Sequence, residues 1–90
     1  MKFQAATVKD FDDMLYIEDQ AHIYPWPEST LLWCLEQPHI LCFSAKRERE
    51  MTSFAIYEHV ADEASLLNIA VRPDYQGQGL GRATLVASLN

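Results

Sequence analysis

The hydrophobic period of the sequence changes at Ile40, and this change limits the fold more than any other feature of the chain. From that point the period becomes two, which is typical of strands with two different faces. The segments 40–45, 51–61 and 65–71 are therefore predicted to be strands, separated by the charge run 46–50 and by a turn around 62–63. Strands joined by such short turns are antiparallel neighbours, because a parallel connection needs about a dozen residues.

The residues before Ile40 predict one strand and two helices. A short strand is expected at 3–7, and Thr7 with Asp10 has the capping-box spacing that starts a helix, over about 8–21. Its expected apolar face holds Phe11, Met14, Leu15 and Ala21. Pro27 suits the first turn of a second helix, which runs to about Gln37. The apolar side of that helix is expected to hold Leu31, Leu32 and Leu35.

Length and charge limit the function classes. Ninety residues allow one domain, 1–90, and a net charge of −6 argues against a nucleic-acid partner, which needs clustered Lys and Arg. Residues 1–45 hold two Lys and seven acidic residues, a net −5, so a basic peptide is the better expectation for a macromolecular partner. No membrane span or secretory signal is recognised, which favours the cytoplasm. Cys34 and Cys42 lack metal-ligand spacing, so no metal is expected and both are predicted to be reduced and packed.

All three glycines of the chain alternate within "QGQGLGR", directly after the last predicted strand and before a helix expected from about Gly79. Small residues there free backbone N–H groups to converge on an anion at the helix N-terminus. A P-loop is excluded, because no Lys follows Lys46, and a dinucleotide fingerprint is not matched by the spacing GxGxG. A turn whose glycines only permit a tight join stays open as the alternative.

The segment "VRPDYQGQGLGRATL", residues 71–85, resembles the coenzyme signature Gln/Arg-x-x-Gly-x-Gly/Ala of the GNAT N-acetyltransferases, filled here by Gln76, Gly79 and Gly81. With "DEASLLNIAV" before it and "IEDQAHIYPWPES" upstream, the chain resembles the branch that acetylates alanine N-termini of ribosomal proteins, from about Ile17 to Leu85. The resemblance implies an α+β (mixed α/β) fold of order β-α-α-β-β-β-α with an antiparallel meander. It also implies acetyl-CoA as the coenzyme.

The resemblance places the coenzyme on two segments of this chain. The pantetheine arm of acetyl-CoA would pair with the backbone of Ile69, Ala70 and Val71, as an added strand does. Gln76 belongs to the signature. The pyrophosphate would lie on the backbone amides of Gly77, Gln78, Gly79, Leu80, Gly81 and Arg82, and the Arg82 side chain is an alternative between phosphate ligand and solvated surface residue.

The resemblance assigns the loop 23–27 to the acceptor side, where Tyr24 and Trp26 would shape a slot for an incoming peptide N-terminus; an aromatic pair that closes the core is the alternative. In the family a Glu and a Tyr of later segments perform the acid–base chemistry, and both would fall after Asn90. The chain is therefore expected to be an N-terminal portion of the domain, with no catalytic residue assigned. A non-catalytic CoA-binding module is the rival function, and an uncovered strand edge predicts self-association.

Overall fold

Four strands and two α-helices make up residues 2–76, the part of the chain that this computed structural model describes. Along the chain these are β1 (Lys2–Ala5), a 3-10 turn η1 (Val8–Asp10), α1 (Phe11–Ala21), α2 (Glu28–Glu36), β2 (Ile40–Arg47), β3 (Glu50–Val60), β4 (Glu63–Val71) and a second 3-10 turn η2 (Pro73–Tyr75). The predicted order is confirmed as far as β4. The helix predicted after the glycine turn lies outside the described residues.

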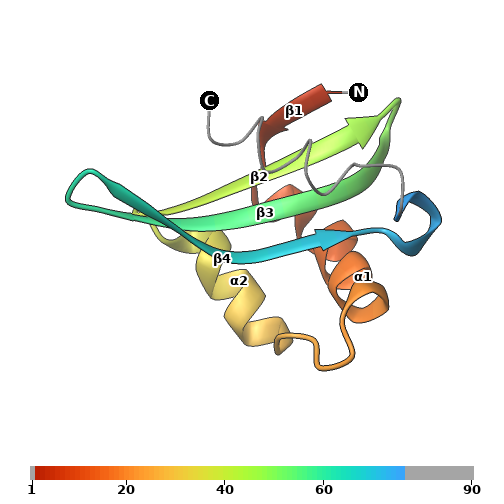
Figure 1. The fold of residues 1–90 in the computed structure, drawn as a ribbon, viewed down its shortest axis with the longest axis horizontal. Coiled ribbons are helices and arrows are strands. Elements are labelled where there is room, and N and C mark those ends of the chain that lie inside the picture. The colour runs from red at the N-terminus through yellow and green to blue at the C-terminus, as the bar shows by residue number, and fades with distance from the viewer. Residues whose placement is uncertain (1, 77–90) are drawn as a thin grey trace.

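The strands form one antiparallel sheet in the order β1-β2-β3-β4, so the predicted meander is confirmed. Helices α1 and α2 lie together on one face of the sheet (Figure 1). Both hairpins have two-residue loops, because Arg47 pairs with Glu50 and Val60 pairs with Glu63. Ala61 and Asp62 both have positive φ, which is the backbone of the type I′ turn that matches the twist of a hairpin. The turn lies one residue earlier than predicted.

The hydrophobic core lies between the helices and β2, β3 and β4. Its fully buried members include Met14 and Ile17 of α1, Leu31 of α2 and Phe54 of β3. Phe11, Leu15 and Ala21, predicted to form the apolar face of α1, are only partly buried beside this cluster. The face of α1 that enters the core is thus rotated toward Ile17, because the sheet lies against one narrow stripe of the helix.

The predicted apolar side of α2 is also partly wrong. Leu31 is buried and Leu35 is partly buried, but Leu32 is 37% exposed and Cys34 takes the inward position. Leu31 and Cys34 are three residues apart and so share one face of the helix, whereas Leu32 is turned about 100° from Leu31. Neither α1 nor α2 is long and apolar enough to cross a membrane.

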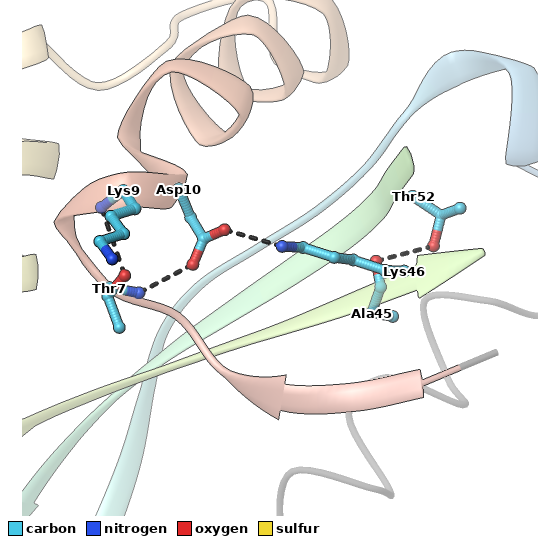
Figure 2. Close-up of polar contacts among 6 residues, drawn as sticks. All are labelled: Thr7, Lys9, Asp10, Ala45, Lys46 and Thr52. Carbon is cyan, nitrogen blue, oxygen red and sulfur yellow. Dashed lines mark hydrogen bonds and ion pairs between the residues drawn. The ribbon is translucent and has the colours of Figure 1, made fainter. Parts of the chain in front are cut away.

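A polar network joins the start of α1 to β2 (Figure 2). The predicted capping pair is confirmed, since the backbone N–H of Thr7 donates to Asp10 Oδ2 at 2.9 Å and the Thr7 side chain accepts in return. Lys46 Nζ donates to the other oxygen of Asp10 at 2.9 Å. The charge run 46–50 was predicted to separate two strands, but Lys46 and Arg47 belong to β2 and Glu50 belongs to β3. The ammonium of Lys46 pairs with the buried carboxylate of Asp10.

Asp10 is expected to make the stability of the domain depend on pH in the acid range. Burial alone would raise the pKa of Asp10, but hydrogen bonds from Lys46 and Thr7 and the lysine charge lower it below 3.8. A lowered pKa stabilises the fold above the ordinary value, and this contribution is lost as pH falls through the folded-state pKa. At pH 7, Asp10→Asn should cost about 1–2 kcal/mol in urea unfolding, and the difference from wild type should shrink below about pH 3.

Asp12→Asn is the matched control for this measurement. Asp12 is exposed in the first turn of the same helix, so its amide variant should change the free energy of unfolding by less than about 0.5 kcal/mol at either pH. An Asp10→Asn difference that stays the same between pH 7 and pH 2.5 would contradict the role given to the Asp10 charge.

Candidate functional site

Strand β4 forms one edge of the described sheet, and its register fixes which backbone groups face outward. Arg72 N donates to Thr52 O at 2.8 Å in the same register that pairs Ala70 with Phe54 and Ile69 with Ala55. In an antiparallel ladder, directly bonded pairs alternate with pairs whose N–H and C=O groups point away from each other. The backbone groups of Ile69 and Val71 therefore face the outer edge, whereas those of Ala70 bond to β3.

A β-bulge interrupts β4 immediately before this outward-facing segment. The register shifts between Ile56 and Tyr57 of β3, which pair with Asn68 and Leu66, so Leu67 is the extra residue on β4. A bulge bends its strand, increases the local twist and re-aims the neighbouring backbone, and bulges are over-represented beside active sites. The bulge separates the outward groups of Ile69 and Val71 from the rest of the strand.

Several side chains hold the end of β4 in place where the chain leaves the sheet. Gln76 Nε2 donates to the outward carbonyl of Val71 at 3.0 Å. Arg72 Nε donates to Met51 O at 3.0 Å, and its guanidinium lies 5.0 Å from the centroid of the Tyr16 ring. The predicted site residue Gln76 thus contacts the predicted strand segment directly.

The 3-10 turn η2 adds one more contact at this end. Tyr75 donates its hydroxyl proton to Glu50 Oε1 at 3.0 Å, and this hydrogen bond is the main reason that the pKa of the Tyr75 phenol is raised. Close by, Asp13, Met51, Arg72 and the β2–β3 turn line a hollow of about 450 Å³. Its walls hold three arginines and three acidic residues, so their mixed charge does not indicate an anion site.

The loop between α1 and α2 holds the two predicted acceptor-side residues in different environments. Tyr24 is 90% exposed, as is its neighbour Ile23, whereas Trp26 is partly buried against the core cluster. Trp26 therefore has part of the core-closing role that was the alternative for the aromatic pair. Tyr24 has no such role, because its ring is almost wholly in solvent.

Glu18 is the residue that sequence reasoning missed. This carboxylate side chain of α1 is only 1% exposed, although acidic side chains are usually solvated. Oε2 accepts from the backbone N–H of Trp26 at 2.9 Å, and Oε1 accepts from Asn68 Nδ2 at 2.8 Å. His22 Nε2 lies 3.5 Å from Oε1. Glu18 follows Met14 by four residues on the buried face of the helix, and this spacing was the signal available in the sequence.

The two thiols are buried and unpaired, which confirms the prediction of packed cysteines. Cys42 Sγ lies 3.9 Å from the Cys34 carbonyl oxygen. Burial, and then the nearby Cys34, raises the pKa of Cys42 to about 12. A thiol with so high a pKa is a poor nucleophile at neutral pH, so the thiols belong to the packing of the core.

The remaining predicted coenzyme residues, Gly77, Gln78, Gly79, Leu80, Gly81 and Arg82, lie outside the described residues. The structure brings together the other predicted groups in two pairs. Gln76 contacts Val71, and Trp26 reaches β4 through Glu18 and Asn68. The contact of any of these residues with a coenzyme stays a prediction.

The model of the acetyltransferase (GNAT) family matches residues 6–88, and the chain belongs to this family. The resemblance of its motifs and the predicted fold class are thereby confirmed, and proteins of this family use acetyl-CoA.

Two curated relatives have high sequence identity to this chain. The ribosomal protein bS18-alanine N-acetyltransferase of Escherichia coli K12 is 46% identical over 76 residues, which are 84% of this chain and 51% of that protein. The enzyme of the same name from Haemophilus influenzae is 40% identical over 76 residues, with the same coverage. The chain thus spans about half the length of the curated relatives it matches.

Solved structures agree with this fold. The crystal structure of the ribosomal-protein-S18-alanine N-acetyltransferase from Escherichia coli has a TM-score of 0.91 at 40% identity, covering 97% of this chain and 56% of that one. The PaiA N-acetyltransferase from Thermoplasma acidophilum, solved in complex with coenzyme A, has a TM-score of 0.79 at 16% identity, covering 98% and 70%. The second likeness concerns the fold alone.

Proposed function

We propose that this chain forms the acetyl-CoA-binding part of an N-acetyltransferase whose acceptor is the α-amino group of a protein N-terminus. The names of the relatives support an alanine of a ribosomal protein as that acceptor. Such a function belongs to the cytoplasm, where ribosomal proteins are made. The observation that carries the proposal is the outer edge of β4, where backbone groups of Ile69 and Val71 face away from β3 beside a bulge.

The outer edge of β4 fits the pantetheine arm of acetyl-CoA. That arm contains amide groups, which can pair with an open strand edge as an added strand does. Ile69 offers both an N–H and a C=O to such a partner, and Val71 offers its N–H while Gln76 occupies its carbonyl. Of the three strand residues expected to bind the arm, Ala70 would contribute only packing, because its backbone groups bond to β3.

The glycine turn would hold the other end of the coenzyme. Gln76 fixes the chain at the edge of β4, and the amides of residues 77–82 follow it directly. Backbone N–H groups that precede a helix bind phosphate well, since the helix dipole adds to their hydrogen bonds. The arm and the pyrophosphate would then lie on two consecutive segments of one chain.

The acceptor would approach from the loop between α1 and α2. Tyr24 and Trp26 would line its path, and the acidic N-terminal half of the chain, with a net charge of −5, favours a basic peptide. The loop is held close to β4 by Glu18. The acceptor amine and the acetyl group of the coenzyme would therefore meet next to the bulge.

Ile69→Pro tests the coenzyme edge. Proline removes the outward N–H without removing a bond of the ladder, since the N–H of Ile69 does not face β3. Isothermal titration calorimetry is expected to show about tenfold weaker CoA binding, the scale of one lost hydrogen bond to the ligand. Ala5→Pro is the matched control: Ala6 N bonds to Cys42 O, so Ala5 presents its N–H outward on β1, at the other edge of the sheet. Equal CoA affinities of the two proline variants would contradict the proposed edge.

A non-catalytic CoA-binding module remains the rival function, and turnover separates the two. Acetyl transfer to a basic peptide that begins with Ala, faster than the uncatalysed reaction, supports the transferase. Saturable CoA binding with no turnover supports the module. The outer edge of β4 would also serve as the pairing surface of a second copy, so the expected self-association stays a prediction for light scattering with and without CoA.

A further inference from the structure

We propose that Glu18 is a positioning residue, which ties the loop carrying Tyr24 and Trp26 to β4 so that the acceptor is held next to the coenzyme edge. The inference rests on the proposed function and deepens it. It assigns a role to the buried acid of α1.

The contacts of Glu18 reach three separate parts of the chain. The residue belongs to α1, its Oε2 accepts from the loop at Trp26 N, and its Oε1 accepts from Asn68 on β4. The backbone carbonyl of Glu18 also accepts from His22 N at 3.2 Å. Two backbone N–H groups of the loop, one at each end, therefore donate to the same residue.

The loop has little else to order it on its outer side. Ile23 and Tyr24 are each 90% exposed, so their side chains bury almost no apolar surface. Trp26 is partly buried against the core cluster, and its backbone N–H is the donor to Glu18. Packing of Trp26 and the carboxylate of Glu18 thus hold the loop backbone two residues from Tyr24.

A buried acid is an expensive way to achieve packing. Removing a carboxylate from water is unfavourable unless hydrogen bonds replace the water, and an apolar residue of similar size usually packs as well or better. Both oxygens of Glu18 accept hydrogen bonds, one from the loop and one from β4. Because core packing alone does not call for this acid, its directional bonds to the loop and to β4 are the property that an apolar residue cannot supply.

The strand contact lies beside the coenzyme edge. Asn68 follows the bulge residue Leu67 and precedes Ile69, whose backbone groups face outward. The side chain of Glu18 therefore connects the acceptor loop directly to the strand that is expected to bind the pantetheine arm. Reactions between two bound molecules depend steeply on such positioning, since a displacement of about 1 Å can cost a factor of about 10² in rate.

Glu18→Gln tests the tie while it keeps the shape of the side chain. The amide keeps an acceptor for Trp26 N but presents an NH₂ group to Asn68 Nδ2, so the bond to β4 is lost unless the Asn68 amide turns its oxygen toward residue 18. In calorimetry with CoA present, the affinity for a basic peptide that begins with Ala should fall about tenfold, while CoA affinity alone should change less than about twofold. Adding Asn68→Asp restores complementarity, because the new amide can donate to the new carboxylate, and should bring peptide affinity back to within about threefold of wild type.

The outcomes separate the two proposals. Wild-type protein that binds no CoA overturns the proposed function. CoA binding with unchanged peptide affinity in both Glu18→Gln and Asn68→Ala overturns the positioning role, because alanine cannot restore the bond by turning an amide over. A wild type that binds CoA but no peptide also overturns it, as does a parallel loss of both affinities that Asn68→Asp does not rescue. If Glu18→Gln does not fold, Asn68→Ala decides at a partly buried position: lower peptide affinity at constant CoA affinity supports the role, and unchanged peptide affinity overturns it.

Discussion

Phe54→Ala is expected to destabilise the domain by about 3–5 kcal/mol, the largest effect of any single substitution discussed for this chain. Phe54 is 0% exposed and belongs to the buried cluster that includes Met14 and Ile17 of α1. Truncation removes the whole aromatic ring from a position in the middle of the sheet, since Phe54 pairs with Ser44 on β2 and with Ala70 on β4. Neighbouring strands on both sides limit how far the site can collapse around the cavity. A domain of this size has about 5–15 kcal/mol of stability in total, so much of it would be lost.

Urea unfolding monitored by circular dichroism measures this loss, and Tyr24→Ala is the matched aromatic control. Tyr24 is 90% exposed, so its truncation should change the free energy of unfolding by less than about 0.5 kcal/mol. Similar unfolding midpoints for the two variants would mean that the cluster around Phe54 does not form the core.

The arrangement of the strands followed from local sequence because hairpins are local structures. The period of two, the charge run and the Asp62 turn are each read within a few residues, and short turns leave only antiparallel neighbours. The error at Lys46 has a different origin. Its partner Asp10 lies 36 residues away, and no local pattern reports a contact across the sheet.

Helix orientation was predicted less well than helix position. The capping pair of Thr7 and Asp10 marked the start of the first helix, but apolar residues of α1 occupy more than one stripe, and the sheet selects which stripe is buried. Leu32 and Cys34 show the same limit on α2. Cys34 is buried because its position on the helix faces the core, and the more apolar Leu32 is exposed because its position faces away from it.

The candidate site also contains parts that local sequence predicts and parts that depend on the packed fold. The strand segment, Gln76 and the glycines form a continuous stretch, so their type and spacing could be recognised, whereas the outward direction of Ile69 depends on its register with β3. Glu18 and Asn68 lie 50 residues apart and meet only after the sheet and helix have packed. An acid within an amphipathic helix is usually assigned to solvent, which is why its burial was not predicted.

Gly79→Val and Gly81→Val are expected to weaken CoA binding by about 1–3 kcal/mol, the scale of leaving buried polar groups unsatisfied. A valine side chain would occupy the space that a pyrophosphate needs when it approaches backbone amides closely. Ser65→Val is the control, because it adds the same side chain at an exposed position of β4, away from the turn. Its CoA affinity should equal that of wild type within about twofold.

Calorimetric titration of CoA into the folded 90-residue chain, side by side with these three variants, tests the central claim most directly. Saturable binding by wild type and Ser65→Val, together with the loss in Gly79→Val and Gly81→Val, is the predicted result. Two results would contradict the claim that the edge of β4 and the segment after it form a coenzyme site. One is the absence of CoA binding by a folded wild-type chain, and the other is wild-type CoA affinity in both Gly79→Val and Gly81→Val.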